Sequence, residues 1–263
     1  MKIQPVSDLH LEFGDIPDIQ NWGADVLILG GDITTGRRLK SGQDVPFFED
    51  VASKFDHVIY YLGNHEFYHG DFIETPKIVR RALKHIPNLH FLNNQHVMID
   101  GVMFWGGTLW TDCNRGNPET LTSIRFSIND YRLIKHGHET LTPQDTFRAH
   151  KKALEELKVF LTSFYDMPIV IATHHSPSFQ SVAPQYKNDF HTNGAFHSEL
   201  SYLMVDVPNI RAWVHGHTHT SAMYYVGNSI VVANPAGYPM RKNLSVFREN
   251  KDFKPDLVID IGK

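Results

Sequence analysis

The sequence predicts an α/β protein, because short strand-like runs alternate with segments of helical periodicity. Five runs are rich in apolar and β-branched residues and too short for helices: residues 2–6, 25–29, 57–62, 168–172 and 210–214. A polar cluster follows each run directly. Ligands gather at the carboxyl ends of strands in α/β sheets. We therefore expect clusters that are far apart in the chain to meet in one crevice.

The clearest helical signal covers residues 142–165. Thr142 can be the N-cap, Pro143 suits the first helical position, and Asp145 favours the positive helix end. Apolar side chains then recur at near 3.6-residue spacing and predict a buried stripe: Phe147, Leu154, Leu157, Leu161 and Phe164. Further helices are expected over 76–86 and 197–204, and further strands over 96–100, 103–106, 222–226, 229–233 and 257–261.

The polar clusters carry metal-ligand chemistry. They are Asp8-Leu9-His10, Gly31-Asp32, Gly63-Asn64-His65-Glu66, Thr173-His174-His175 and His215-Gly216-His217-Thr218-His219. In an extended segment the side chains at i and i+2 point the same way, so Asp8 should pair with His10 and His217 with His219. Carboxylate, amide and imidazole ligands suit a first-row divalent metal. Asp32 is the natural bridge between two ions.

The ordered motifs resemble those of the calcineurin-like metallophosphoesterase superfamily: Asp-x-His, Gly-Asp, Gly-Asn-His-Asp/Glu, His and Gly-His-x-His. Every element is present between residues 8 and 219. Segments 67–68, 108–112 and 234–238 look closest to small bacterial or phage phosphohydrolases of the superfamily. The resemblance implies a sandwich of two mixed β-sheets flanked by helices, with αββα layers.

The resemblance also implies a ligand set. One metal ion would be held by Asp8, His10, Asp32 and His219, and the other by Asp32, Asn64, His174 and His217. His174 and His175 are both possible at their motif; His174 is preferred because it directly follows the strand, which leaves His175 behind the ligands or facing the substrate. His65 is left free to protonate the leaving oxygen or to stabilise its charge. Glu66 is expected to cap or orient the next turn.

Each motif alone also has an ordinary interpretation. Asp-Leu-His and Gly-Asp suit strand-end turns, Gly-Asn-His-Glu suits an N-capped helix, and Gly-His-Thr-His could be a surface histidine pair. Their joint occurrence in one order favours the metal site. Most other histidines are expected at the surface or in the core, with His191 in the 188–194 loop a candidate for substrate contact.

Composition agrees with one catalytic domain over residues 1–263, since 41% of the residues are hydrophobic and no linker or repeat interrupts the chain. The first strand begins at once, no run is long enough to span a membrane, and Cys113 is the single cysteine. These features predict a cytoplasmic protein.

A net charge of -4 gives no general basic surface for nucleic acid. Two divalent ions would still attract a phosphate to the crevice. A small phosphoester is therefore the expected substrate, with neither long duplex nucleic acid nor membrane as partner.

Residues 112–140 read as the least regular long stretch, either an active-site lid or a solvated excursion. In a lid, Asn114 and Arg115 could bind the phosphate oxygens. Arg241 is a further candidate for substrate binding.

These features predict a dinuclear metal-dependent phosphohydrolase that cleaves small phosphomonoesters or phosphodiesters by attack of a hydroxide bridging the metals. Manganese is the preferred ion, with iron, zinc, nickel or cobalt possible. Two alternatives stay open: a DNA-processing nuclease of the same superfamily, and a metal-containing scaffold that binds proteins.

Overall fold

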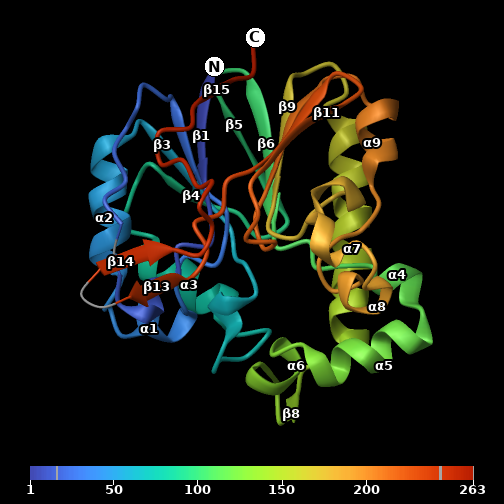
Figure 1. Ribbon diagram of the computed structural model, residues 1–263. Coiled ribbons are helices and arrows are strands. Elements are labelled where there is room, and N and C mark those ends of the chain that lie inside the picture. Colours follow the sequence, from blue (N-terminus) through green and yellow to red (C-terminus); the bar gives the residue numbers. More distant parts are fainter. Residues whose placement is uncertain (16, 243–244, 263) are drawn as a thin grey trace.

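Two mixed sheets pack face to face between two layers of helices (Figure 1), in a computed structural model that describes residues 1–15, 17–242 and 245–262. The first sheet has parallel strands β1 (Lys2–Val6), β2 (Val26–Leu29), β3 (His57–Tyr60) and β4 (Leu89–Phe91), with β15 (Ile259–Asp260) antiparallel to β1. The second has the order β11 (Ala222–Val226), β12 (Ser229–Ala233), β10 (Ile210–His215), β9 (Ile169–Thr173), β6 (Val102–Gly107) and β5 (Gln95–Ile99). Its central strands are parallel, and β5 and β11 are antiparallel edges.

Strand β2 shows why the inner strands are apolar throughout. Val26 and Ile28 pack between the two sheets, whereas Leu27 and Leu29 pack against the helices outside the first sheet. Successive side chains of a strand point to opposite faces, so a sheet covered on both faces needs apolar residues at every position. The five strand-like runs of the sequence are therefore buried strands.

Helices cover the outer face of each sheet. The first is covered by α1 (Gly36–Lys40), α2 (Val45–Lys54) and α3 (Thr75–Leu83), and the second by α7 (Pro143–Ser163) and α9 (Ser201–Asp206) (Figure 1). The predicted αββα sandwich is confirmed. The helix expected over 76–86 is α3, and the one expected over 197–204 begins later, at Ser201.

Helix α7 begins as expected, with Thr142 and Asp145 forming a reciprocal capping box. Of the predicted stripe, Leu157 and Leu161 are buried. The remaining members, Phe147, Leu154 and Phe164, pack at the margin, and Ala153 and Phe160 complete the buried face.

The prediction of irregular structure over 112–140 holds for Cys113–Gly116, where all four residues have positive φ, and was wrong for the rest of the segment. This segment forms α4 (Cys113–Gly116), α5 (Pro118–Ser127), α6 (Asp130–Leu133) and a hairpin of β7 (Lys135–His136) and β8 (Glu139–Thr140). Asn117 and Pro118 suggested a loop, but the Asn117 side chain accepts from the backbone N–H of Thr120 and Pro118 occupies the first turn. The same two residues begin a helix.

Three elements near the site carried no clear sequence signal: α8 (Phe190–Asn193) and the hairpin strands β13 (Pro239–Lys242) and β14 (Ser245–Arg248). Within the described residues, no helix combines the length and the apolar character needed to cross a membrane.

Candidate metal centre

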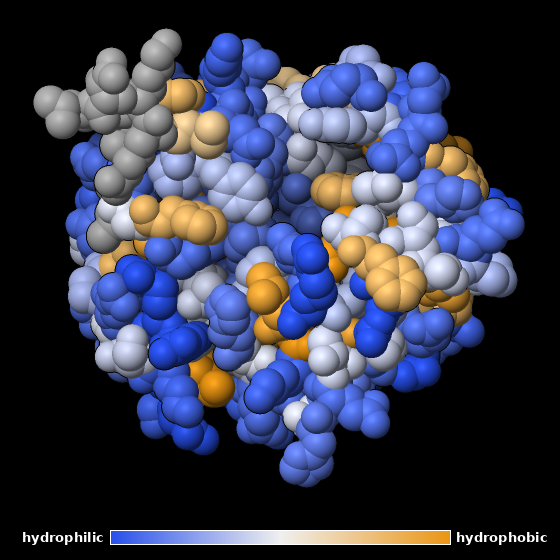
Figure 2. Space-filling view, turned by 60° about the horizontal axis from the view of Figure 1, so that its bottom comes forward, coloured by the Kyte–Doolittle hydropathy of each residue, from blue (hydrophilic) through white to orange (hydrophobic). Residues whose placement is uncertain are grey.

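The five polar clusters meet at one edge of the sandwich, as predicted. Asp8 follows β1, Asp32 follows β2, and Asn64 follows β3; His174 and His217 follow β9 and β10 of the other sheet. Figure 2 views the molecule with this side turned forward, and its surface is mostly hydrophilic with scattered apolar patches.

The backbone of the clusters is not extended, so the premise of the argument from i and i+2 was wrong, although Asp8 and His10 do lie in one donor group as that argument predicted. Asp8, His10, Asp32, His217 and His219 all have φ between 47° and 68°, in the left-handed region. His217 and His219 lie in different donor groups.

Two glycines allow the first-sheet loops to touch. A Cβ on Gly63 would lie 2.1 Å from Oδ1 of Asp32, and one on Gly31 would lie 2.4 Å from the backbone nitrogen of Gly63. Only glycine permits this approach. It brings Asp32 beside the loop that carries Asn64 and His65.

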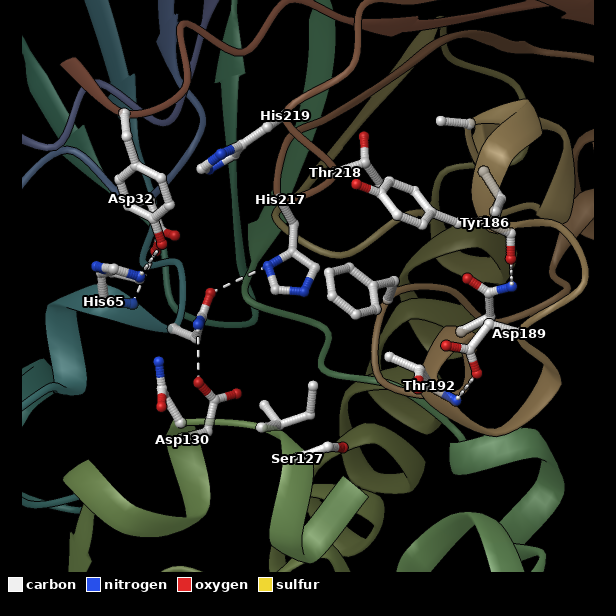
Figure 3. Close-up of a pocket in the computed structure, with 18 of the residues that line it drawn as sticks. Asp32, His65, Ser127, Asp130, Tyr186, Asp189, Thr192, His217, Thr218 and His219 are labelled. Carbon is white, nitrogen blue, oxygen red and sulfur yellow. Dashed lines mark hydrogen bonds between the residues drawn. The ribbon is translucent and has the colours of Figure 1, made fainter. Parts of the chain in front are cut away.

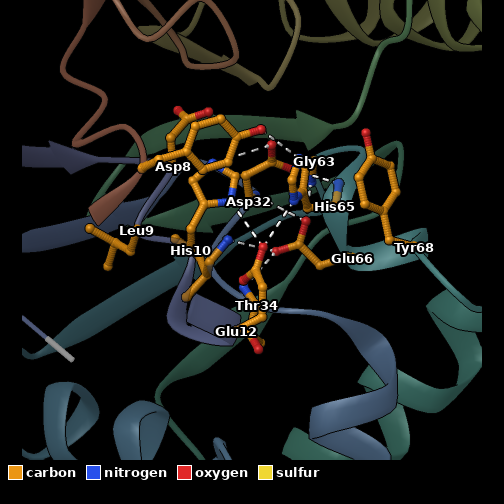
Figure 4. A network of polar contacts seen from close by, with 12 residues as sticks. Asp8, Leu9, His10, Glu12, Asp32, Thr34, Gly63, His65, Glu66 and Tyr68 are labelled. Carbon is orange, nitrogen blue, oxygen red and sulfur yellow. Dashed lines mark hydrogen bonds and ion pairs between the residues drawn. The ribbon is translucent and has the colours of Figure 1, made fainter. Parts of the chain in front are cut away.

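Glu66 forms hydrogen bonds with both of these loops (Figure 4). Its carboxylate accepts from the backbone N–H groups of Gly63 (2.7 Å), Asp32 (2.9 Å) and Ile33 (2.8 Å), and from the hydroxyl of Tyr60 (2.9 Å). Burial, followed by the Asp32 carboxylate, raises the pKa of Glu66 to about 7. Glu66 therefore orients the site by joining two strand ends, and it does not cap the following turn.

Three groups of donors lie within 4.8 Å of one another among the described residues: Asp8 with His10 and His219, His10 with Asp32 and His65, and Asp32 with His174 and His217. In the first, Nε2 of His219 lies 3.1 Å from Nε2 of His10 and 3.3 Å from Oδ1 of Asp8. Around the third, Oδ1 of Asn64 lies 3.1 Å from Nε2 of His174 and 3.1 Å from Nδ1 of His217.

Asp32 lies between these groups. Its Oδ2 is 3.9 Å from Nε2 of His10 and 3.4 Å from Nε2 of His174, while Oδ1 accepts from the backbone N–H of His65 at 2.7 Å. The residues expected to hold two ions thus form two adjoining groups with one shared carboxylate.

The hydrogen bonds of the imidazoles fit a cation. Nδ1 of His10 donates to Glu12 (3.0 Å) and Nδ1 of His219 donates to Glu249 (2.7 Å), because an ionised carboxylate can only accept. The two Nε2 atoms face each other at 3.1 Å, and the raised pKa of His219 means that its Nε2 carries a proton in the metal-free protein. A metal ion that replaced this proton would be held by two nitrogens and a carboxylate oxygen.

The surroundings attract positive charge. Burial opposes protonation of His174, but Asp32 outweighs it and raises the pKa of His174 to about 9. Burial is likewise outweighed at His219, whose pKa is raised to about 10 by Asp8 and Glu249. The acidic side chains that favour a proton at these nitrogens would also favour a metal ion.

His65 is held at both ring nitrogens. Its Nδ1 lies 2.9 Å from Oε1 of Glu12, and its Nε2 lies 3.1 Å from the hydroxyl of Tyr238. Burial opposes its charge, but Asp32 and Glu12 raise its pKa above the ordinary value. His65 can therefore keep a proton close to Asp32 and the cavity.

Three residues that the sequence suggested for substrate binding, His175, Asn114 and Arg115, do not line the cavity. His175 is buried behind His217, where Nδ1 meets the carbonyl of Thr108 at 3.1 Å and burial lowers its pKa to about 3. The Asn114 amide donates to Thr120 and to the carbonyl of Phe190, and Arg115 is exposed outside the cavity lining. The Arg241 side chain lies outside the described residues. His191 contacts Thr120 and does not line the cavity.

A cavity of about 440 Å³ opens over the donor groups. Figure 3 shows His217 and His219 at its inner end, with Ser127 and Asp130 on one side and Tyr186, Asp189 and Thr192 on another. Part of the 112–140 segment thus forms a wall of the cavity, through residues 127–130.

Several residues that hold or line the site had no assigned role in the sequence-based prediction, among them Glu12, Asp130, Tyr238 and Glu249. Glu12 follows the Asp-Leu-His motif by two residues, which was a usable signal. Asp130 and Glu249 are brought in by α6 and the β13–β14 hairpin, and no local pattern pointed to them.

Comparisons with known proteins identify the family and agree with the fold. The calcineurin-like phosphoesterase family model matches residues 1–221. An uncharacterized protein of Acanthamoeba polyphaga mimivirus, L509, is 29% identical over 287 residues, covering 98% of this chain and 96% of that protein. Phosphopantetheinyl hydrolase from Mycobacterium tuberculosis has a similar fold, with a TM-score of 0.67 at 15% identity, covering 95% of this chain and 96% of that one. The chain belongs to the calcineurin-like phosphoesterase family and is a metal-dependent phosphoesterase.

Proposed function

We propose that this protein is a two-metal phosphohydrolase of small phosphomonoesters or phosphodiesters. The observation that carries the proposal is the position of Asp32, whose Oδ2 lies 3.9 Å from Nε2 of His10 and 3.4 Å from Nε2 of His174. Oδ2 of this carboxylate thus lies near donors of both groups, while Oδ1 accepts from the backbone N–H of His65. Asp32 would then be the shared ligand of two neighbouring divalent ions.

The remaining ligands follow from the two donor groups. Asp8, His10 and His219 would complete one ion's set, and Asn64, His174 and His217 the other's. The ions supply Lewis acidity toward the phosphoryl oxygens and activate water at neutral pH. Nitrogen and oxygen ligands of this kind suit manganese, iron, zinc, nickel or cobalt, and manganese is our choice.

The chain itself supplies the proton. As an imidazolium, His65 carries one proton on Nδ1 against Glu12 and a second on Nε2, which faces the cavity beside the hydroxyl of Tyr238. The Nε2 proton would pass to the departing alkoxide as the bond from phosphorus to oxygen breaks, which leaves a neutral ring with its proton on Nδ1. Glu12 would stabilise the charged imidazole and keep the ring oriented.

The charges of the cavity favour a small substrate over nucleic acid. Among its described lining residues Asp32, Asp130, Asp189 and Glu249 are acidic, and none is lysine or arginine. A nuclease groove needs cationic contacts to successive phosphates. A nuclease and a protein-binding scaffold remain as alternatives for the test to separate.

The test is a substrate screen on protein stripped with a chelator and reloaded with manganese. The panel contains phosphomonoesters, cyclic nucleotides, linear diesters and single-stranded DNA. We expect manganese-dependent turnover of small esters and no DNA cleavage. Preferential DNA cleavage would establish the nuclease, and two bound ions without any turnover would establish the scaffold.

A further inference from the structure

The cavity extends well beyond the donor groups, and its outer part is built differently from its inner end. The outer wall consists of Ile128, Val182, Ala183, Tyr186 and Phe196. These residues come from the link between α5 and α6 and from the segment that follows β9. A cavity of about 440 Å³ is within the range that holds an organic molecule rather than a phosphate group alone.

Phe196 connects the two parts. Its ring lies 4.8 Å from the ring of His217, with an angle of 34° between the planes. Its carbonyl accepts from the backbone N–H of Ser176, which holds it beside the segment that carries His174. The organic part of a phosphoester bound at the metal-ligand residues would therefore contact the Phe196 ring.

Tyr186 is placed at the outer end. Its side chain is 58% exposed, and its carbonyl accepts from the buried amide of Asn193 at 2.6 Å. An exposed aromatic ring on a fixed backbone is a ready stacking surface for a second ring.

The polar part of the outer cavity is acidic. Asp189 is exposed, lines the cavity and accepts from the backbone N–H of Thr192 at 3.1 Å. No lysine or arginine is found among the lining residues within the described part of the chain. A second phosphate or a carboxylate would be repelled there, whereas a ring with N–H donors or a positive charge would be attracted.

We propose that the outer wall binds the leaving group, and that the preferred substrates are phosphoesters with one phosphate and a flat aromatic leaving group that is neutral or cationic. This inference rests on the proposed function. Tyr186 and Phe196 supply the stacking faces, and Asp189 sets the preferred charge.

The test uses phosphoesters of primary alcohols that differ in shape and charge but little in leaving-group acidity. The series is ethyl, cyclohexylmethyl, benzyl, 4-carboxybenzyl and 4-(aminomethyl)benzyl phosphate, each as the monoester and the methyl diester. We expect kcat/KM for benzyl to exceed that for ethyl by about 10-fold or more, since even one buried methylene contributes about 10-fold. Benzyl should also exceed cyclohexylmethyl, and the aminomethyl compound should exceed the carboxy compound.

Two variants and a control assign the preference. Tyr186→Leu should lower the benzyl to cyclohexylmethyl ratio toward one. Asp189→Asn keeps a side chain that can accept from Thr192 but removes the charge, so it should reduce the ratio of aminomethyl to carboxy compound about 5-fold or more, in line with a surface charge interaction. Phe190→Leu is the control, because Phe190 is 59% exposed and does not line the cavity.

Two results would overturn the inference while leaving the proposed function intact: equal turnover of ethyl and benzyl esters, or a preference for the carboxy compound. Ratios that are unchanged in both variants would also overturn it. Absence of turnover across the whole series, ethyl esters included, would instead contradict the proposed function itself.

Discussion

Oδ1 of Asp130 accepts a hydrogen bond of 2.8 Å from Nδ2 of Asn64. This contact fixes the orientation of the amide, because its nitrogen must face the carboxylate and its oxygen must face His174 and His217. Tyr68 donates to the same carboxylate oxygen at 2.8 Å. A residue of α6 thus decides which atom Asn64 offers to the metal centre.

Asp130→Ala should weaken the ion held by Asn64, His174 and His217 by roughly 10 to 100-fold, the usual effect of removing a group that orients a metal ligand. The affinity of the other ion should change much less. Titration of the stripped protein with manganese, followed by its paramagnetic resonance, measures both. Arg132→Ala, on the exposed face of the same helix, is the control. Equal weakening at both sites would argue against this role.

Asp32→Asn should reduce binding of both ions, because one side chain serves both donor groups. Asn64→Ala should mainly affect one. Metal counting on purified protein distinguishes the two patterns. Two fully occupied sites in the Asp32 variant would remove its assignment as the bridge.

His65→Ala should retain both ions and lose activity according to the leaving group. The loss should reach roughly 10² to 10⁴-fold for alkyl phosphoesters and be much smaller for a nitrophenyl ester, whose anion departs without a proton. The measurement is kcat/KM over leaving groups of graded acidity. A uniform loss would assign His65 to phosphate binding. Loss of metal would make it a ligand with His10 and Asp32, the arrangement in which these donors also cluster.

Glu66→Gln should destabilise the fold by about 1 to 3 kcal/mol, because the new amide presents a donor to N–H groups that need an acceptor. Urea unfolding in the presence of a chelator measures this without contributions from metal binding. Glu155→Gln, on the exposed face of α7, should change stability by less than about 0.5 kcal/mol. An unchanged midpoint in the Glu66 variant would show that its contacts contribute little.

Metal affinity should rise with pH. The raised pKa values of His174, about 9, and His219, about 10, mean that protons compete with metal well above the ordinary histidine value of 6.5. The folding stability of the metal-free protein should instead fall as pH rises. Stabilisation from these protonated imidazoles is fully present below 6.5 and is lost as pH rises through their folded pKa values.

Dissociation constants for manganese between pH 6 and 9 test the rise in metal affinity. Thermal unfolding of the stripped protein over the same range tests the fall in its stability. Activity should fall toward about pH 6 as metal is lost. Retention of both ions at pH 5 would contradict the proton competition.

The sequence determined the layers and the strand ends of this protein. Strands such as β2 are apolar at every position because both faces of the sheet are covered, and that property is local enough to be visible in a short run. Ligand types such as Asp8, His174 and His217 directly follow these strands. Strand direction alone was therefore enough to bring residues from distant parts of the chain to one edge.

The tertiary structure decided how the side chains of those residues are oriented. The positive φ values at Asp8, His10 and His217 and the close approach of Gly31 to Gly63 belong to the loops, and the strand pattern does not encode them. The partners that fix proton and amide positions, Asp130 on Asn64 and Glu249 on His219, come from 66 and 30 residues away along the chain. Such contacts form only after the two sheets and their connecting segments have packed, since hydrogen bonding at this edge depends on distances that no local pattern fixes.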